Sequence, residues 1–315
     1  MMKYTGIDIG GTKCAVMTGS AESGITAKIK FETASVEETL ANIISGVEKL
    51  GAENAIGISC GGPLDSKRGV ILSPPNLPGW DHIEIVKLLR EHFSVPVGIQ
   101  NDANACALAE WKYGAGKGTQ NMIFLTFGTG LGAGLILDGR LYSGTNDMAG
   151  EAGHIRLENF GPVGYGKRGS FEGFCSGGGI AELGKMLARE KLQTGCAPAY
   201  CKDYASLEAI TAKSIAECAA AGDPTAKRVY EICGEKLGAG LSILIDLLNP
   251  EKIVIGSVFE RSGHLMRTEM ERVIVRETLS YAREVCEVVP AKLGDEIGDW
   301  AAIAAAENIY LEETK

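Results

Sequence analysis

The chain has 315 residues, of which 45% are hydrophobic and 23% are charged, and its formal net charge is -9. These proportions are those of an ordinary globular protein and exclude the disordered and fibrous classes. The 31 basic residues are dispersed among 40 acidic ones, which argues against nucleic acid as a partner because phosphate backbones are bound by clustered cations. A chain of this length suits two domains better than one core.

The N-terminal sequence and the cysteines favour a cytoplasmic protein. The opening residues, MMKYTGIDIGGTK, enter an apolar strand pattern without the basic and long apolar segments of an export signal. No apolar run reaches the roughly 20 residues that span a bilayer, so we expect no membrane partner. The nine cysteines lack the dense, even spacing of a secreted disulfide scaffold. We interpret them as reduced and mostly buried.

The first third of the chain predicts a β-meander followed by helices and strands. Short β-prone runs between Gly-containing turns predict strands, at 4–9, 13–18, 27–33 and 55–59. A helix is expected over 36–50, where the apolar residues recur at helical spacing. A strand at 97–100 is followed by Asn101 and Asp102, which are suited to cap a helix over 103–113.

The rest of the chain repeats the first hairpin and then becomes helical. Two strands, at 122–127 and 134–138, flank a Gly-rich turn in the manner of 4–9 and 13–18, so one supersecondary unit is used twice. The remaining strong patterns predict helices and one strand, at 226–248, 253–255, 265–279 and 300–311.

These patterns predict two α/β lobes. The segment GAGKG at 114–118 is aperiodic and Gly-rich, as linkers are, and we place a boundary there. The first lobe is expected to comprise residues 1–118 and to be completed by a C-terminal helix within 299–315. The second lobe is expected to comprise residues 119–298.

Two Gly-rich turns are candidate phosphate-binding sites. The first, DIGGTK at 8–13, lets backbone N–H groups meet phosphate oxygens, while Asp8 holds Mg²⁺ through water and Thr12 and Lys13 reach anionic oxygens. The second, TFGTGLGAG at 126–134, is not a Rossmann motif because no helix follows it directly. Either turn alone is compatible with an ordinary hairpin. Together they predict a nucleotide bound in a cleft between the lobes.

The sequence NDAN at 101–104 is a candidate catalytic site. An aspartate at a strand-to-helix junction can orient an attacking hydroxyl and accept its proton, as the catalytic aspartate of kinases does. Helix capping is the alternative role for the same residues. A helix N-terminus is expected to lower the pKa of Asp102, so most of the catalysis would come from positioning and charge neutralisation.

The motifs together resemble the ROK family. They follow that family's order over nearly the whole chain and are DIGGTK at 8–13, SCGGPLD at 59–65, PNLPGW at 75–80, NDANACALAE at 101–110, TFGTGLGAGLILDGRLYSG at 126–144, AGEAGH at 149–154 and NPEKIVIG at 249–256. The resemblance implies the actin-like ATPase and sugar kinase fold, which is ribonuclease H-like and has two α/β lobes with an inter-lobe cleft. It also implies an ATP-dependent kinase, similar to glucokinases and N-acetylhexosamine kinases, that phosphorylates a sugar hydroxyl.

The resemblance implies roles for individual residues, with Asp102 as the catalytic base. The implied sugar-binding residues are Gly62, Asn76, Asn101, Asp102, Glu151, His154 and Glu172. The implied residues for ATP and Mg²⁺ are Asp8, Gly10, Gly11, Thr12, Lys13, Thr129, Gly130 and Gly256. Carboxylates and amides suit vicinal hydroxyls, since unpaired buried polar groups penalise the wrong epimer. Residue type alone would favour a structural histidine at His154.

The chain departs from the family where most members bind zinc. The family pattern is a His in the GH step followed by CxCGxxGCxE, and VGYGKRGSFE stands at 163–172 instead. Val163, Tyr165 and Ser170 replace the three thiols. Zinc needs about four ligands and Val163 offers none, so we predict no structural zinc and no metal-ligating residues. Tyr165 and Phe171 are expected to pack where the metal braces the loop in the family. A substitute site at Cys175, or at Cys196 with Cys201, stays open.

Two other functions were weighed against the kinase. ROK-type sugar-responsive transcriptional regulators carry a helix-turn-helix segment of tens of residues before the DIGGTK-like motif. In this sequence six residues precede Ile7, so we do not expect a regulator. A non-catalytic sugar-binding protein would not need the complete set of polar residues. The sequence does not identify the sugar, and we expect a gluco-configured hexose, phosphorylated at its 6-hydroxyl, or the N-acetylamino analogue. The resemblance suggests a homodimer.

Overall fold

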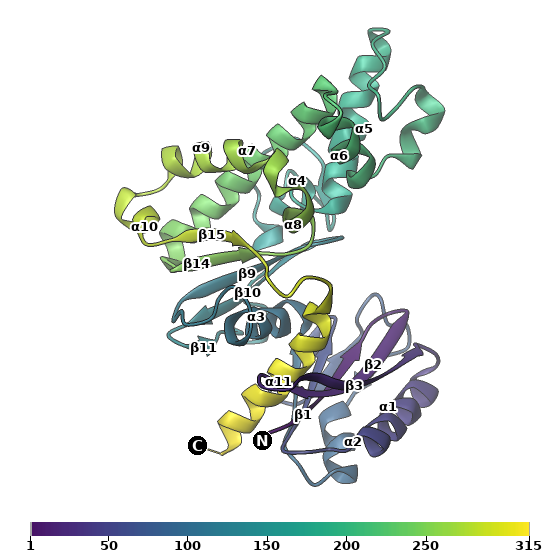
Figure 1. Ribbon diagram of the computed structural model, residues 1–315. Helices are drawn as coiled ribbons and strands as arrows, with labels where there is room; N and C mark the ends of the chain where they lie inside the picture. The colour runs from purple at the N-terminus through teal and green to yellow at the C-terminus, as the bar shows by residue number, and fades with distance from the viewer. Residues whose placement is uncertain (1, 315) are drawn as a thin grey trace. The chain divides into compact units, whose positions relative to one another are not determined.

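The computed structural model describes residues 2–314 and divides into two compact units (Figure 1). Unit 1 contains the residues up to Gln120, the segment Gly134–Ala149 and the residues from Lys292 on. Unit 2 contains Asn121–Ala133 and Gly150–Ala291. The units differ from the expected lobes in three segments, 119–120, 134–149 and 292–298, which belong to unit 1.

Unit 1 is built on a five-stranded sheet in the order β3-β2-β1-β4-β8. The strands are β1 (Tyr4–Ile9), β2 (Lys13–Ser20), β3 (Gly24–Glu32), β4 (Ile56–Cys60) and β8 (Val97–Asn101). The first three form an antiparallel meander, and β4 and β8 join it in parallel. The register aligns Ile9 with Cys60 and Cys60 with Asn101. The carboxyl ends of β1, β4 and β8 therefore meet at one edge of the sheet, which is where open α/β sheets bind ligands.

Helices cover both faces of this sheet. They are α1 (Val36–Leu50), α2 (Ile85–His92), α3 (Asp102–Lys112) and α11 (Ile297–Glu313). On one face, Ile43 of α1 and Leu89 of α2 belong to the same buried cluster as Ile7. On the other face, α11 packs so closely that a Cβ on Gly57 would lie 2.1 Å from the Ala306 backbone nitrogen. The alanine-rich sequence of α11 permits this approach.

Shorter elements complete unit 1. They are a three-stranded sheet of β5 (Leu64–Asp65), β6 (Val70–Leu72) and β7 (Asp81–Ile83), the 3₁₀ helix η4 (Gly294–Glu296), and a hairpin of β10 (Leu131–Leu137) with β11 (Arg140–Leu141). The chain passes from unit 2 into unit 1 within β10.

The expected linker at 114–118 is tied firmly to α3. The buried Glu110 side chain accepts a hydrogen bond from the Ala115 N–H at 2.7 Å. Its other oxygen accepts from the backbone N–H groups of Lys292 at 2.9 Å and Leu293 at 2.8 Å. One carboxylate thus joins the end of α3 to the segment that returns the chain to unit 1.

Unit 2 has its own parallel strands. They are β9 (Met122–Phe127), β14 (Lys252–Ile255) and β15 (Glu287–Pro290), with Phe124 opposite Val254 and Val254 opposite Val289. The second sheet has the order β11-β10-β9-β14-β15, which repeats the first sheet's plan of a meander followed by parallel strands. The predicted repeat of one supersecondary unit is consistent with this order.

The rest of unit 2 is mainly helical. Its helices are α4 (Phe171–Phe174), α5 (Gly177–Gln193), α6 (Ala212–Ala220), α7 (Pro224–Leu248), α8 (Val258–Ser262), α9 (Arg267–Glu277) and α10 (Ser280–Glu284), with 3₁₀ helices η1 (Ala152–His154), η2 (Tyr204–Ala209) and η3 (Gly263–Leu265). Two short strands, β12 (Val163–Gly164) and β13 (Lys167–Arg168), form a hairpin. Helix α7 begins with Asp223 as its N-cap and Pro224 in the first turn, and Asn249 ends it in the left-handed conformation.

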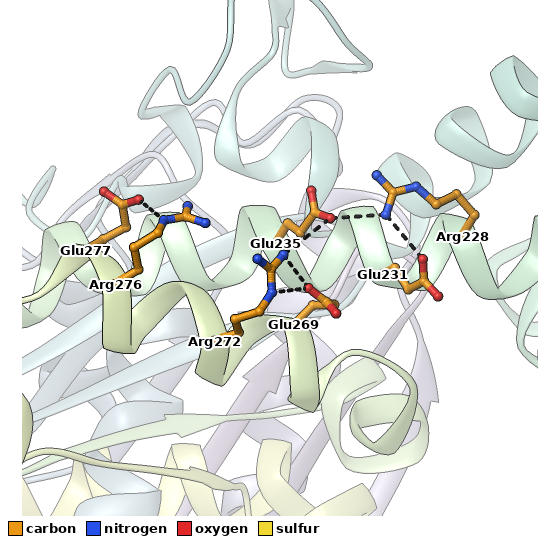
Figure 2. A network of polar contacts seen from close by, with 7 residues as sticks. All are labelled: Arg228, Glu231, Glu235, Glu269, Arg272, Arg276 and Glu277. Atoms are coloured by element: carbon orange, nitrogen blue, oxygen red, sulfur yellow. Dashed lines mark hydrogen bonds and ion pairs between the residues drawn. The ribbon is translucent and has the colours of Figure 1, made fainter.

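Helices α7 and α9 contact each other through backbone and through charges. A Cβ on Gly234 would lie 2.4 Å from the Met266 carbonyl oxygen, so only glycine permits this approach. Figure 2 shows the ion pairs that run along the two helices. Arg272 pairs with Glu269 on α9 at 2.6 Å and with Glu235 on α7 at 3.9 Å.

The structure confirms most predicted elements and corrects one. The strands at 4–9 and 122–127 and the helix at 36–50 have the predicted bounds. The single helix predicted over 265–279 is wrong, because Thr278 and Leu279 are extended and separate α9 from α10. The Leu279 N–H instead donates to the Asp246 carboxylate at 3.1 Å. Within residues 2–314 there is no helix with the length and apolarity needed to cross a membrane.

Candidate active site

Asp102 lies where β8 ends and α3 begins. The Asn101 side chain caps α3 by accepting a hydrogen bond from the Asn104 N–H at 2.8 Å. One oxygen of Asp102 accepts from the Ala103 N–H at 2.8 Å. Its other oxygen has no hydrogen-bond partner within residues 2–314. The capping role that competed with catalysis is therefore performed by Asn101, which leaves one Asp102 oxygen available to a substrate.

The expectation that the helix N-terminus lowers the pKa of Asp102 is wrong. Burial raises the pKa of this carboxyl, and the backbone hydrogen bonds at the helix start oppose the shift without cancelling it. The side chain nevertheless keeps solvent-accessible surface. Asp102 is thus reachable from solvent yet poorly hydrated, which makes it a stronger proton acceptor than an ordinary surface aspartate.

Asp8, near the end of β1, has a more strongly perturbed carboxylate. Its pKa is raised to about 6, mainly by burial and then by the charge of Asp299, while Lys28 opposes the shift and Asp102 adds a smaller increase. Lys28 forms an ion pair with Asp299. Neither Lys28 on β3 nor Asp299 on α11 belongs to a recognisable motif, so sequence reasoning missed both. Only the acidic first turn of the last helix hinted at Asp299.

The backbone of the first Gly-rich turn is held by hydrogen bonds, whereas the side chains of Thr12 and Lys13 make none within residues 2–314. The Gly10 N–H donates to the Lys13 carbonyl at 3.1 Å, and the Thr33 hydroxyl donates to the Gly10 carbonyl at 2.6 Å. The side chains of Thr12 and Lys13 are exposed and form no hydrogen bond or ion pair in the described part of the chain. They are therefore available for an anionic ligand.

Asn76 lies against this turn and against the loop after β4. A Cβ on Gly11 would lie 2.4 Å from the Asn76 carbonyl oxygen, and one on Gly61 would lie 3.2 Å from its side-chain amide. The neighbouring Leu77 and Trp80 are buried and anchor the segment. A Cβ on Gly62 would enter open space. Unit 1 thus brings together its predicted residues at the carboxyl ends of β1, β4 and β8.

The second Gly-rich turn, in unit 2, lies at the start of α5. The Gly177 N–H donates to the Gly128 carbonyl at 2.8 Å, and Ser176 caps the helix. A Cβ on Gly128 would lie 3.9 Å from the Ser257 hydroxyl, which follows Gly256. Sequence reasoning missed the helix start at Gly177, although a serine before three glycines and an apolar residue was a visible signal. The turn, this helix N-terminus and Gly256 form one surface, with Thr129 exposed.

Glu172 joins this turn to the GEAGH motif. Its Oε2 accepts a hydrogen bond from the Leu131 N–H at 3.0 Å, and a Cβ on Gly130 would lie 2.7 Å from the same oxygen. A Cβ on Gly153 would lie 2.0 Å from the Leu131 carbonyl oxygen. Glu151 and His154 border η1, where both are exposed. Unit 2 therefore groups its predicted sugar residues with the turn that carries Thr129 and Gly130.

A small hairpin stands where the family pattern has zinc thiols. Tyr165 and Gly166 have φ values of 43° and 75° and form the turn between β12 and β13. The buried Ser170 hydroxyl accepts from the Gly173 N–H at 3.1 Å and donates to the Gly164 carbonyl at 3.4 Å. The expected packing of Tyr165 is wrong, because its side chain is 83% exposed. Phe171 is fully buried, as expected.

No alternative metal cluster replaces the thiols in the described residues. No group of three His, Cys, Asp or Glu side chains is arranged to hold a metal ion there. Cys175 is buried and donates to the Cys233 carbonyl at 3.6 Å. Cys196 is exposed and Cys201 is buried. The substitute site left open by the sequence finds no support.

Comparisons with known proteins identify the family and the fold. The sequence profile described as "ROK family" matches residues 4–308. The glucokinase of Halalkalibacterium halodurans is 32% identical over 309 residues, which are 94% of this chain and 92% of that protein. A ROK family glucokinase from Streptomyces griseus, solved in complex with glucose and AMPPNP, has a TM-score of 0.74 and 30% identity and covers 97% of this chain and 99% of that one. A ROK family transcriptional regulator, homologous to the E. coli MLC protein, has a TM-score of 0.83 and 25% identity, covering 98% and 78%.

Proposed function

We propose that this chain, which belongs to the ROK family, phosphorylates the 6-hydroxyl of a gluco-configured hexose or its N-acetylamino analogue. The chain has the actin-like ATPase fold and is an ATP-dependent sugar kinase. Asp102 is the proposed base. The observation that carries this proposal is the free Asp102 oxygen at the aligned carboxyl ends of three strands. Ligands of open α/β sheets bind at such ends.

In the proposed mechanism the residues of unit 1 orient and deprotonate the sugar. Asp102 accepts a hydrogen bond from the attacking hydroxyl through its free oxygen and takes the proton late in the transfer. The Asn101 Oδ1 already accepts from Asn104, so its amide NH₂ is the group left to bind a sugar oxygen. The open space beside Gly62 allows the sugar to approach the backbone.

The residues of unit 2 are proposed to add sugar specificity and to bind the nucleotide. Glu172 uses one oxygen to hold Leu131, which leaves the other to accept from a sugar hydroxyl, beside Glu151 and His154. The N-terminus of α5 and the turn at Thr129 and Gly130 present backbone N–H groups to phosphate. In unit 1, the unpaired Thr12 and Lys13 are the matching phosphate ligands.

The residues present also fit Mg²⁺. Asp8, with its pKa near 6, is ionised at neutral pH, and carboxylate oxygens are the ligands that Mg²⁺ prefers. Asp299 adds a second carboxylate to the same neighbourhood. When bound, Mg²⁺ would supply positive charge to the phosphates of the nucleotide. Asp8 would hold the ion, through water, and Lys28 would keep Asp299 in place.

The experiment that tests the function is a coupled ATP assay over a panel of hexoses and N-acetylhexosamines. Asp102→Asn keeps an acceptor for the Ala103 N–H and removes the base, so kcat is expected to fall by about 10²–10⁴-fold with sugar affinity retained. Asp81→Asn, on the exposed strand β7, is the control and should leave kcat unchanged. An Asp102→Asn enzyme within tenfold of wild type would end the case for the base. Sugar binding without turnover in the wild type would favour a non-catalytic binding protein.

A transcriptional regulator is not favoured. The glucokinase of Halalkalibacterium halodurans is matched over 92% of its length and the regulator structure over 78% of its chain. A kinase also needs the free oxygen of Asp102 and the unpaired Lys13, whereas sugar sensing alone needs neither group.

We also propose a homodimer in the cytoplasm. All nine cysteines are free, as reduced thiols are in that compartment. In unit 2, Leu247, Val275, Leu279 and Tyr281 expose between 61% and 86% of their surface on α7, α9 and around α10. On α9, Arg272 pairs with Glu269 and Arg276 pairs with Glu277 (Figure 2), so these charges adjoining the apolar face are paired, and the face can meet its own copy. Sedimentation velocity tests the proposal: wild type should be a dimer, and Tyr281→Glu with Leu247→Glu a monomer.

A further inference from the structure

We propose that unit 1 contains a second ligand site, which binds a phosphate monoester of a polyhydroxy compound and regulates the kinase. The site is a cavity of about 870 Å³ at the open edge of β8. It is lined by β8, the turn 66–69, α2, the segment 141–144 and the C-terminal part of α11. Its volume is that of small-molecule sites. None of the predicted sugar, nucleotide or catalytic residues lines it.

Two of the cations that line the cavity, Lys67 and Arg68, form no ion pair within residues 2–314. The Arg68 side chain has no ion pair or hydrogen bond within residues 2–314, and the Lys67 ammonium contacts only the Thr145 carbonyl, at 3.4 Å. The other two cations are neutralised, because Lys87 pairs with Glu84 and Arg90 pairs with Glu313.

The acids that line the cavity belong to the two helices. They are Glu91 on α2 and Glu312 and Glu313 on α11. Lys67 and Arg68, which form no ion pair in the described part of the chain, are adjacent on the turn 66–69. A guanidinium beside an ammonium suits a phosphate group, which arginine binds through two parallel hydrogen bonds.

A buried acceptor gives the second, independent indication of a ligand. The Gln100 Oε1 is buried and has no hydrogen-bond partner in the described part of the chain, and Gln100 lines the cavity. Buried polar atoms are rarely left unpaired, because the lost hydration is not recovered. Rotation of the Gln100 amide toward the cavity would bring this oxygen to a ligand hydroxyl. Ser143 and Asn308 line the same cavity and offer further polar groups to a hydroxylated chain.

The position of the cavity connects it to catalysis. Gln100 precedes Asn101 and Asp102 directly on β8. Ser143 accepts a long hydrogen bond, 3.5 Å, from the Asn104 side chain in the first turn of α3. A ligand that bonds Gln100 and Ser143 therefore holds the strand and the helix turn on either side of Asp102. Occupancy of the cavity alters kcat without competition with the sugar. This proposal rests on the proposed kinase activity but not on the identity of the sugar.

Direct binding to the full-length chain tests the site without any turnover. The probes are glucose 6-phosphate, glycerol 3-phosphate and inorganic phosphate, titrated calorimetrically. Lys67→Ala with Arg68→Ala should weaken binding of the two phosphate esters at least tenfold and leave basal kcat unchanged. Lys30→Ala with Lys49→Ala removes two exposed lysines elsewhere in unit 1 and should change neither quantity. The two esters separate the reaction's own product class, a hexose phosphate, from other polyol phosphates.

A second variant and the inhibition pattern complete the test. Gln100→Leu, checked for native circular dichroism, should reduce the preference for the esters over inorganic phosphate, because the hydroxyl acceptor is gone. Inhibition by the binding ester should be noncompetitive with sugar in the wild type and should vanish, or become purely competitive, in the Lys67→Ala, Arg68→Ala variant. Absence of binding at millimolar ester, or equal binding and the same inhibition pattern in that variant, overturns the proposal.

Discussion

Asp8 and Asp299 share one acidic neighbourhood in unit 1, although they stand at opposite ends of the chain. The Asp8 Oδ2 lies 3.6 Å from where a Cβ on Gly298 would stand. The pKa of Asp8 is raised to about 6, mainly by burial and then by the Asp299 charge, while Lys28 opposes the shift. The Lys28–Asp299 ion pair holds these groups together. The pKa of a predicted Mg²⁺ ligand is therefore adjusted by two residues outside every recognised motif.

This relationship predicts the acid limb of the pH–activity profile. Asp8 must be ionised to hold Mg²⁺, so kcat/KM should fall as the pH drops through about 6. Asp299→Asn removes a like charge and releases Lys28, and both changes lower the pKa of Asp8, so the limb should move to lower pH. Lys28→Met should move it to higher pH. Asp295→Asn, in the exposed 3₁₀ turn before α11, is the control. Shifts of the same sign in both variants would contradict this account.

The same pKa shift makes a prediction about stability. The folded-state pKa of Asp8 lies above its ordinary value, so its contribution to stability is complete below about pH 4 and is lost as the pH rises through about 6. At pH 8 the ionised group costs about 3 kcal/mol. Asp8→Asn should therefore raise the free energy of unfolding of the ligand-free protein at pH 8, and not at pH 4, while activity is lost. Urea denaturation at the two pH values measures this, and an equal effect at both would contradict it.

Local signals predicted most of the elements well. A strand, two capping residues and a helix pattern placed Asn101 and Asp102, because capping depends on neighbours in sequence. The helix predicted over 265–279 failed for the opposite reason. Its break is determined by Asp246 on α7, whose carboxylate accepts from the Leu279 N–H, and no periodicity around 278 reports a partner so far away in sequence.

The electrostatics of the site was the least predictable part. A helix N-terminus alone predicts a lowered pKa for Asp102, whereas desolvation by residues from the whole unit raises it. Lys28 and Asp299 meet only because β3 and α11 are brought together by the fold. Tyr165 was expected to pack because of its size, yet it occupies a left-handed turn position that points it to solvent. These outcomes depend on tertiary packing, which short sequence windows do not encode.

Glu110 is predicted to be essential for the stability of unit 1. Its carboxylate accepts hydrogen bonds from the backbone of Ala115, Lys292 and Leu293. Glu110→Ala should lower the free energy of unfolding by about 3 kcal/mol, since three donors lose their acceptor. Glu110→Gln should cost less, because one acceptor oxygen remains. Glu48→Ala, exposed on α1, should stay within about 0.5 kcal/mol of wild type. A Glu110→Ala protein as stable as this control would show that the connection is dispensable.

The hairpin at 163–168 is predicted to be stable without zinc. Ser170 caps α4 and bonds Gly164, so Ser170→Ala should cost about 1–2 kcal/mol, whereas Ser35→Ala, at the exposed cap of α1, should cost less. A zinc chelator should leave the melting temperature of the wild type unchanged. Stoichiometric zinc in the purified protein, or a fall in melting temperature on chelation, would contradict the prediction.

Glu172 allows the structural and sugar-binding roles of one carboxylate to be separated. Its Oε2 holds the Leu131 N–H beside the turn of Thr129 and Gly130, and its other oxygen is the proposed sugar acceptor. Glu172→Gln keeps a carbonyl oxygen for Leu131 and loses the charge, so the KM for sugar should rise about tenfold, equivalent to 1.4 kcal/mol, with stability unchanged. Glu172→Ala loses both bonds, so the KM for ATP should rise as well and the free energy of unfolding should fall by about 1 kcal/mol. The two variants could instead raise the KM for sugar and the KM for ATP equally. That result would show that the assignment of one Glu172 oxygen to Leu131 and the other to the sugar is wrong.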